Sequence, residues 1–541
     1  MSEVFKCACG CSFKVLPSTG LLPSIKFSPK LENLNLFCTK TWEMISEGNT
    51  KGCFQLESRL GQMMAKKLKP ENIEQLAALI SILRPGCLEA VRDNKTVSNH
   101  YIDKKNGLES VDYFHPSLED ILSTTYGEMI YQEQSMQIAQ KLADFDLKEA
   151  DMLRKAIGKK KPEEMAKIKQ KFIEGCKQLN IVSIKEAEEI FGWIEKSQRY
   201  SFKKSHAISY AINAYLSAYA KAHFPKVFFA AYLKFAKDKM DSQQEIKELV
   251  KNANDMDIGV SIPDIRLLNK FFLIRDKYIY FGLTDIKGLG QSAYDKLLTI
   301  VADIDLYTIS WSEFVIMVLL KMSSTASQAL ISSGALDHYN KSRTEMLFEL
   351  NIVSELTNKE SEHLLGQIQS NDGHSLINGL REILSMKHMN KKRKQIIIGL
   401  TENLINPPYS LVDKIEWLSD SESDLLGTSI TCSKLDSYDI RTTNSNCRTV
   451  KNASSPQKVV IAGEIIGVNI IKTKTGKTPG LEMAFVSIED QVGVLDSIIF
   501  FPEKFQEYKH HLFNTNVLVF VGNKTKTKDG VIVDKCLMPT T

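Results

Sequence analysis

The chain has 541 residues, of which 43% are hydrophobic, 25% charged and 9% aromatic. At roughly 100–200 residues per domain this length predicts several domains, and the composition excludes disordered, collagen-like and coiled-coil proteins. No apolar run approaches the roughly 18 residues of a membrane helix, and the start has no signal-peptide core, so we expect a cytoplasmic protein. Lys and Arg number 69 against 65 Asp and Glu, so a nucleic acid would have to bind local basic patches.

Three of the ten cysteines alternate near the start, in F-K-C-A-C-G-C-S-F-K. Cys7, Cys9 and Cys11 resemble one zinc knuckle, and a tetrahedral site needs a further ligand, for which Cys38 is the next candidate. Two interpretations stay open here, a structural zinc ion held by these cysteines or a reduced hairpin without metal.

Hydrophobic periodicity divides the rest of the chain into helical and strand-rich stretches. Apolar residues recur every three or four residues from residue 40 to 265, which predicts helices. They alternate with polar residues around residue 275, and after residue 458 the pattern predicts short strands. We predict a multidomain α+β protein with a knuckle or palm-remnant segment at 1–39, helical fingers at 40–265, tandem helix-hairpin-helix at 266–345, a helical connector at 346–455 and an all-β OB-type barrel at 456–541.

The segment I-K-G-L-G-Q-S-A-Y-D-K-L, residues 286–297, has the form of a helix-hairpin-helix. Gly288 and Gly290 would let backbone N–H groups and the next helix N-terminus approach a DNA phosphate, with Lys287 alongside. The alternative is a plain helix C-cap. A second stretch, S-S-T-A-S-Q-A-L-I-S-S-G-A-L-D, favours the hairpin, which would bind DNA without sequence preference.

Basic loops accompany the strands of the predicted barrel. Such loops beside Phe485 and Phe500 would suit a single strand held by charge and base stacking. The alternative is a solvated hairpin with both rings in the core. The first loop carries Lys472, Lys474 and Lys477, and a later one carries Lys524, Lys526 and Lys528.

Positive charge is concentrated between residues 148 and 204, which include 15 Lys and Arg against nine Asp and Glu. Arg154, Lys155 and Lys159 fall on neighbouring turns of one predicted helix, and residues 203–206, K-K-S-H, lie just before another. This pattern suits a polyphosphate bound by charge and helix N-terminal amides. The alternative is a solvated charged helix face.

Several long motifs, in one order, resemble the fingers of bacterial C-family replicative polymerases, the DNA polymerase III alpha subunits. The resemblance runs from about residue 40 to 541. The motifs are G-C-F-Q-L-E-S (52–58), L-I-S-I-L-R-P-G (79–86), Y-G-E-M-I-Y-Q-E-Q-S-M-Q-I-A (126–139), A-D-M-L-R-K-A-I-G-K-K-K-P-E-E-M (150–165), Y-S-F-K-K-S-H-A (200–207), K-A-H-F-P-K-V-F-F-A-A (221–231), I-K-G-L-G (286–290) and L-L-G-T-S-I-T (425–431).

The resemblance implies a DNA-directed DNA polymerase that acts in DNA replication and binds dNTP with Mg²⁺ and primer-template DNA. By motif position, Arg154, Lys155, Lys159 and Lys204 would contact the triphosphate, while Ser205 and His206 would lie near the sugar. The family commonly has an amide where this chain has Lys203, which puts a polar contact from that position in doubt. No Q-x-x-L-F-like peptide is evident at 340–425, so binding to a sliding clamp is left open.

The largest departure from the family is the missing palm, whose carboxylates hold two catalytic metal ions. None of the three Asp-x-Asp pairs, at 144–146, 255–257 and 303–305, has the strand-turn setting of a palm. We therefore expect one part of a split enzyme, inactive alone, whose partner chain supplies the palm. The alternative is a non-catalytic DNA-binding replication factor derived from a polymerase fragment. The host could be a bacterium or a phage-infected cell.

Overall fold

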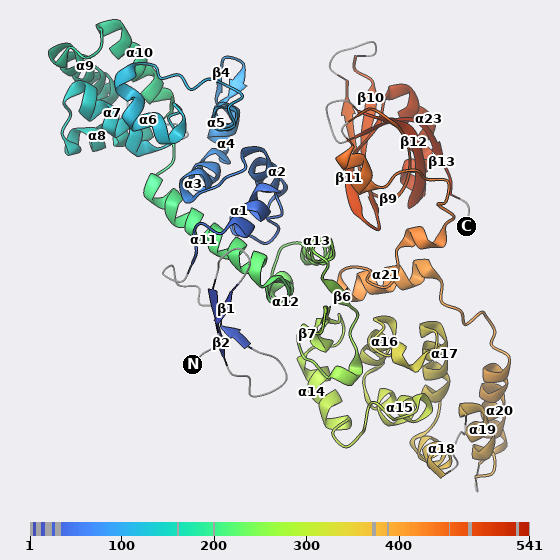
Figure 1. The fold of residues 1–541 in the computed structure, drawn as a ribbon. Helices are drawn as coiled ribbons and strands as arrows, with labels where there is room; N and C mark the ends of the chain where they lie inside the picture. Colours follow the sequence, from blue (N-terminus) through green and yellow to red (C-terminus); the bar gives the residue numbers. More distant parts are fainter. Residues whose placement is uncertain are drawn as a thin grey trace. The chain divides into compact units, whose positions relative to one another are not determined.

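The protein is described from a computed structural model, which covers residues 4–6, 12–16, 24–26, 34–159, 162–197, 201–370, 375–386, 389–453, 455–473, 479–525 and 530–539. Only the backbone is described for residues 4–6, 12–16, 24–26, 157–159, 162–164 and 452. The chain folds into two compact units, Met1–Phe228 and Phe229–Thr541 (Figure 1). No helix within the described residues is both long and apolar enough to cross a membrane.

The first unit starts with a small antiparallel sheet in the order β1-β2-β3 and continues mainly as helices. Its elements are β1 (Val4–Lys6), β2 (Ser12–Leu16), β3 (Ser24–Lys26), α1 (Thr39–Ser46), α2 (Arg59–Leu68), α3 (Ile73–Ile82), α4 (Pro85–Glu89), β4 (Val91–Arg92), β5 (Lys95–Thr96), α5 (Val97–Lys105), α6 (Glu119–Leu122), α7 (Gln132–Ala143), α8 (Leu147–Lys159), α9 (Pro162–Leu179), α10 (Ile184–Ser197), α11 (Lys204–His223) and α12 (Pro225–Ala236), the last of which crosses into the second unit.

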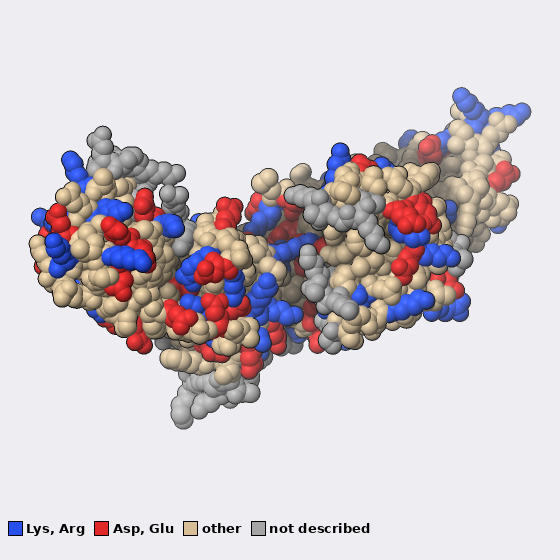
Figure 2. Space-filling view, turned by 90° about the horizontal axis from the view of Figure 1, so that it is seen from above, with Lys and Arg blue, Asp and Glu red and all other residues tan. Residues whose placement is uncertain are grey.

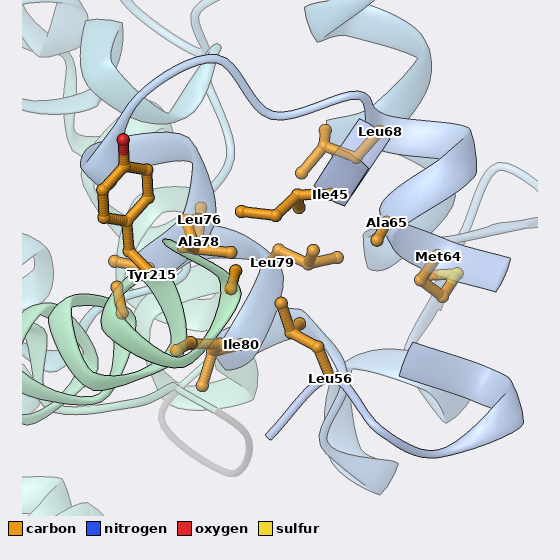
Figure 3. Packing of buried hydrophobic residues seen from close by; sticks show 14 of the residues in the cluster. Ile45, Leu56, Met64, Ala65, Leu68, Leu76, Ala78, Leu79, Ile80 and Tyr215 are labelled. Carbon is orange, nitrogen blue, oxygen red and sulfur yellow. The ribbon is translucent and has the colours of Figure 1, made fainter. Parts of the chain in front are cut away.

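Two hydrophobic cores organise this unit. In the first, α3 is buried along almost its whole length between α1, α2 and α11, which explains its continuous apolar sequence (Figure 3). Asn72 is the N-cap of α3, and its side chain accepts a hydrogen bond from the Gln75 amide at 2.9 Å. The second core is formed by the helices from α6 through α10. The helices break at Pro225, because α11 ends at His223 and α12 begins at this proline.

The second unit begins with helices and a short mixed sheet, in which β6 runs parallel and β7 antiparallel to β8. Its helical part contains α13 (Ser242–Asp255), β6 (Gly259–Ser261), β7 (Leu273–Arg275), β8 (Tyr278–Tyr280), α14 (Gln291–Ile300), α15 (Trp311–Met317), α16 (Ser324–Ser332), α17 (Arg343–Ser354), α18 (Asn358–Ser370), α19 (Leu376–Ile383), α20 (Lys391–Ile405), α21 (Ile415–Leu426) and α22 (Cys447–Asn452).

A closed barrel of five strands follows, in the order β10-β11-β13-β12-β9. Its elements are β9 (Lys458–Lys472), β10 (Glu482–Asp490), β11 (Gly493–Phe500), α23 (Pro502–Asn514), β12 (Val517–Lys524) and β13 (Val531–Leu537). The third and fifth strands, β11 and β13, pair in parallel, and a helix connects the third and fourth strands. This is an OB-type barrel, so the predicted fold class is confirmed.

Candidate nucleotide and DNA interface

Helix α11 begins at Lys204, one turn earlier than the sequence suggested, so Lys204, Ser205 and His206 form its first turn. The Lys204 amide donates to the Glu133 carboxylate at 2.9 Å, and the Lys204 ammonium lies 3.3 Å from the Glu74 carboxylate and 5.5 Å from the centre of the Tyr131 ring. Carboxylates from α3 and α7 therefore fix the start of the helix and the position of its first lysine.

Aromatic rings form a column along the N-terminal half of α11. The His206 ring lies 5.4 Å from Phe202 and 4.1 Å from Tyr210, and Tyr210 lies 5.1 Å from Phe54. The Arg84 guanidinium is 4.6 Å from the centre of the Phe202 ring. His206, Arg84 and Phe54 are exposed, so this aromatic column of Phe54, Tyr210, His206 and Phe202 borders solvent. Flat rings of this kind can stack on a base.

The column was missed from the sequence, apart from His206. The spacing of Phe202, His206 and Tyr210 at four residues was the available signal, since such residues face one another on a helix. No sequence pattern indicated that Phe54 or Arg84, from two distant motifs, would extend it.

The buried Lys221 fixes the loop that carries Phe54. Its ammonium donates to the backbone carbonyls of Asn49 at 3.0 Å and Lys51 at 2.9 Å, and burial lowers the pKa of Lys221 to about 8. The Phe54 amide also donates to the Ser217 hydroxyl at 3.0 Å. The G-C-F-Q-L-E-S loop is thereby held against α11, which sets the position of Phe54 beside Tyr210.

The cations predicted on α8 share one carboxylate. Arg154 donates from Nε and Nη2 to Asp151 Oδ1 at 2.9 and 2.8 Å, while the Lys155 ammonium lies 2.7 Å from Asp151 Oδ2. The hydrogen bonds from Lys155 and Arg154 lower the pKa of Asp151. Lys159 ends α8, and its side chain lies outside the described residues. The helix therefore carries its cations together with a counter-ion.

Basic and acidic side chains are also interspersed over the wider surface. On the face drawn in Figure 2, Lys and Arg alternate with Asp and Glu over the surface, in keeping with a net charge of only +4. Anion binding thus depends on particular side chains and not on a broad field.

The helix-hairpin-helix turn has the backbone that its glycines suggested. Gly288 has a φ of +95°, which favours glycine, and a Cβ there would lie 3.3 Å from Thr325 Cγ2. Gly290 precedes α14, and a Cβ at this position would meet no atom within 4 Å among the described residues. Lys287 is exposed, and its amide donates to the Leu425 carbonyl at 2.9 Å. The N-terminus of α14 is therefore open to a close approach.

The predicted contacts of the OB barrel are corrected in part. Phe500 is fully buried and packs edge-on against Phe520 at 6.1 Å, which agrees with the alternative of a ring in the core, and Lys524 is also buried, so the predicted contact of this lysine with a strand is not supported. Both side chains are buried, and the sequence alone did not decide which face of each strand is buried. Lys472 ends β9 and is exposed, and Phe485 is half-buried. Lys474, Lys477, Lys526 and Lys528 lie outside the described residues.

Four of the six aspartates in the Asp-x-Asp pairs have identified local structural roles. Asp144 ends α7 with a φ of 53°, Asp146 accepts the Glu149 amide at 2.8 Å, and Asp305 accepts the Tyr307 amide at 2.9 Å. Asp255 pairs with Arg448. Across the described part of the chain, no three His, Cys, Asp or Glu side chains are grouped so as to hold a metal ion. These residues do not fit a two-metal catalytic centre.

Of the four predicted zinc ligands, only Cys38 belongs to the described residues. Its buried Sγ accepts a hydrogen bond from the Thr41 hydroxyl at 3.3 Å and lies 3.2 Å from His223 Nε2. Cys7, Cys9 and Cys11 lie outside the described residues.

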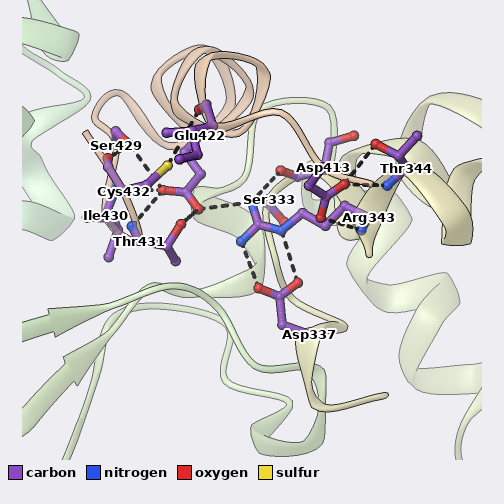
Figure 4. Close-up of polar contacts among 12 residues, drawn as sticks. Ser333, Asp337, Arg343, Thr344, Asp413, Glu422, Ser429, Ile430, Thr431 and Cys432 are labelled. Carbon is purple, nitrogen blue, oxygen red and sulfur yellow. Dashed lines mark hydrogen bonds and ion pairs between the residues drawn. The ribbon is translucent and has the colours of Figure 1, made fainter. Parts of the chain in front are cut away.

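The L-L-G-T-S-I-T motif is anchored by a buried ion pair (Figure 4). Arg343 Nη1 lies 2.9 Å from Glu422 Oε1, and both side chains are almost inaccessible to solvent. The second Glu422 oxygen accepts the amides of Ile430 at 2.6 Å and Thr431 at 2.9 Å. One carboxylate therefore joins α17 of the helical region to the segment that leads to the barrel, which gives this motif a structural role.

Comparison with known proteins agrees with the motifs. Residues 24–180 match the bacterial DNA polymerase III alpha subunit finger domain, and residues 257–346 match the helix-hairpin-helix motif. The chain is a relative of the bacterial DNA polymerase III alpha subunit. It is 30% identical to that subunit from Borreliella burgdorferi over 528 residues, 31% identical to that from Pseudomonas aeruginosa over 506 residues, and 30% identical to that from Aquifex aeolicus over 487 residues.

These alignments take in most of this chain but less than half of each relative. They cover 95%, 90% and 89% of the chain, and 42%, 41% and 37% of the subunits from B. burgdorferi, P. aeruginosa and A. aeolicus. The resemblance noted in the sequence is confirmed, and residues 24–180 match the finger domain of this subunit.

Proposed function

We propose that this chain holds the incoming dNTP and the primer-template DNA for a DNA polymerase during replication, while a separate chain supplies the palm and its catalytic Mg²⁺ ions. The observation that carries the nucleotide assignment is the convergence on α11 of motifs from distant parts of the chain. Phe54 and Tyr131 contact this helix, and Arg84 contacts Phe202 just before it.

The geometry suits a nucleotide in two respects. Lys204 at the first turn of α11 offers an ammonium group for a phosphate, and the helix N-terminus favours a negative charge. The aromatic column beside it offers rings for a base or sugar. Arg154, Lys155 and Lys159 would add charge for the triphosphate, and Ser205 and His206 would lie near the sugar.

The DNA assignment rests on the hairpin of the second unit. Gly288 makes the turn, and Gly290 leaves the start of α14 open to a phosphate, with Lys287 beside it. The exposed Lys472 of the barrel would hold a strand by charge, as would Lys474 and Lys477.

The chain's own residues thus bind and position the substrates, and Mg²⁺, when supplied by the palm, would stabilise the charge that develops in phosphoryl transfer. Of the carboxylates in the Asp-x-Asp pairs, those of Asp146 and Asp305 accept backbone amides and that of Asp255 pairs with Arg448.

Primer extension tests the division of labour. We expect highly purified chain with Mg²⁺ and dNTPs to extend no primer, and activity to appear when a palm-bearing chain is added. Extension by the chain alone, abolished by Asp144→Ala with Asp146→Ala, would contradict the proposal. A chain that binds DNA but never supports extension with any palm-bearing partner would instead favour a non-catalytic DNA-binding factor.

A further inference from the structure

An exposed phenylalanine between two lysines lies in the second unit, just before β7. The Phe271 side chain is 41% exposed, and the ammonium groups of Lys234 and Lys270 lie 4.2 and 5.0 Å from the centre of its ring. The neighbouring Phe272 turns the other way, because its ring packs 4.7 Å from the buried Phe281. Phe235, which is 60% exposed, lies next to Lys234 on α12. These four residues, Lys234, Phe235, Lys270 and Phe271, are here named the lysine–phenylalanine patch.

The lysines of the patch differ from the described cations that we propose for the triphosphate. Lys204 pairs with Glu74, and Arg154 and Lys155 pair with Asp151. Within the described residues, by contrast, neither Lys234 nor Lys270 forms an ion pair with a carboxylate, and each rests against the Phe271 ring. Asp285, the acid on which the charge of Lys234 acts, is itself paired with Lys237 at 2.6 Å. The two ammonium groups are therefore available to phosphates.

The patch is joined rigidly to the helix-hairpin-helix turn. The Lys270 carbonyl accepts hydrogen bonds from the Thr284 hydroxyl at 2.6 Å and the Thr284 amide at 3.2 Å. A Cβ on Gly282 would lie only 2.5 Å from this carbonyl, so the two segments are in the closest contact that a glycine allows. The turn at Gly288 follows a few residues later. Lys237 extends the connection to α12 by donating to the Thr284 carbonyl at 2.8 Å.

We propose that the lysine–phenylalanine patch binds the unpaired DNA strand where the duplex held by the hairpin ends. An exposed aromatic ring can stack only on a base that is not already stacked in a duplex, and flanking ammonium groups suit the phosphates on either side of that base. Charge complementarity and continuity with the hairpin argue for a nucleic acid over a protein partner. The inference rests on the proposed duplex grip and extends it to the adjoining single strand.

Binding of three DNA hairpins by the full chain tests this inference. They share one stem: one ends flush, the second carries a 5′ single-stranded extension, and the third carries a 3′ single-stranded extension. We expect fluorescence anisotropy to show roughly tenfold tighter binding of one extended form, since base–aromatic stacking contributes substantially per base. Phe271→Leu should remove most of this difference and leave the flush duplex affinity unchanged. Lys234→Gln with Lys270→Gln should also reduce its salt dependence.

Phe513→Leu serves as the matched control, because Phe513 is an exposed phenylalanine, at 55%, on α23 of the barrel. It should retain the full preference for the extension. As a direct readout, 5-iododeoxyuridine in the first unpaired nucleotides should photocross-link to the peptide that contains Phe271.

The inference is overturned if Phe271→Leu keeps the wild-type preference, if no preference exists, or if cross-links map only to other peptides. In each of these cases retained binding of the flush duplex would leave the proposed hairpin grip intact. If the wild-type chain does not bind the flush duplex at all, the proposed function is contradicted instead.

Discussion

The Lys204 ammonium lies 3.3 Å from the Glu74 carboxylate, at the point where α11 begins. An ion pair at a helix N-terminus holds the lysine in one place while leaving it about one-third exposed, since its side chain is 34% accessible. A triphosphate that reaches this lysine must compete with a carboxylate, and the same holds for Arg154 and Lys155 beside Asp151. In the proposed nucleotide site, these three cations are thus each paired with a carboxylate.

Removing the carboxylate on α8 should strengthen nucleotide binding. Asp151→Asn keeps the side-chain shape but frees Arg154 and Lys155, and we expect the dNTP dissociation constant to fall about fivefold, because the ion pair no longer has to be broken when the nucleotide binds. Glu149→Gln, which frees Lys171 on α9 by the same charge change, is the control and should have little effect. Equal tightening in both variants would show only a general effect of net charge.

A side chain at Gly290 should weaken duplex binding without unfolding the protein. The position has a φ of −71°, and a Cβ would meet no described atom within 4 Å, so Gly290→Val is compatible with the fold and would obstruct only an approaching DNA backbone. We expect a loss of at least tenfold for duplex and less for single-stranded DNA, measured by anisotropy at several salt concentrations. Unchanged duplex affinity, or equal losses on both substrates, would contradict the hairpin assignment.

The Gly288→Ala variant gives a contrasting case. The φ of +95° at Gly288 strains any residue with a Cβ, so the thermal stability of this variant should fall together with its DNA binding. Gly290→Val should reduce binding alone.

Acid should loosen the contact between α18 and α20. Arg393 donates to both oxygens of Glu360 at 2.9 and 2.6 Å, and these hydrogen bonds lower the pKa of Glu360 to about 2. The unfolded state binds more protons than the folded state between this value and the ordinary pKa near 4.5. The stabilisation is thus complete above about pH 4.5 and is lost as the pH falls towards 2.

Glu360→Gln should remove this pH dependence and lower the local stability at pH 7 by about 1.5–3 kcal/mol, the contribution of a charge-assisted hydrogen bond. Hydrogen exchange of peptides from α18 and α20 at pH 7 and pH 3 measures both effects. If the wild type and the variant respond identically to acid, the ion pair is not the cause.

Zinc binding near the start of the chain stays a prediction. Cys38 Sγ lies 3.2 Å from His223 Nε2, a spacing close to the roughly 3.5 Å between two ligands of one tetrahedral zinc ion. We expect about one zinc per chain, held by Cys38 with Cys7, Cys9 and Cys11 or with His223, and a lower content in Cys38→Ser. Metal analysis showing far less than one zinc per chain in protein purified without chelator would end this prediction.

Local rules made some features predictable from the sequence and left others open. Gly288 was identifiable because a turn with positive φ requires glycine, and the barrel strands were identifiable from their alternation. The burial of Phe500 stayed undecided because alternation gives two faces without saying which one is buried, and the burial of Lys524 was not foreseen. The aromatic column depends on contacts between Phe54, Arg84 and α11 that only the packed structure brings together.

A dNTP titration of the purified chain tests the central claim most directly. Lys204 and Lys203 are adjacent, but Lys204 lies at the first turn of α11 beside Glu74 while Lys203 is exposed just outside the helix. We predict that Lys204→Ala weakens dNTP binding roughly tenfold or more, since charge-assisted hydrogen bonds contribute about 1.5–3 kcal/mol each. Lys203→Ala should change it less than twofold. Equal affinities for the wild type and Lys204→Ala would contradict the assignment of a nucleotide site to α11.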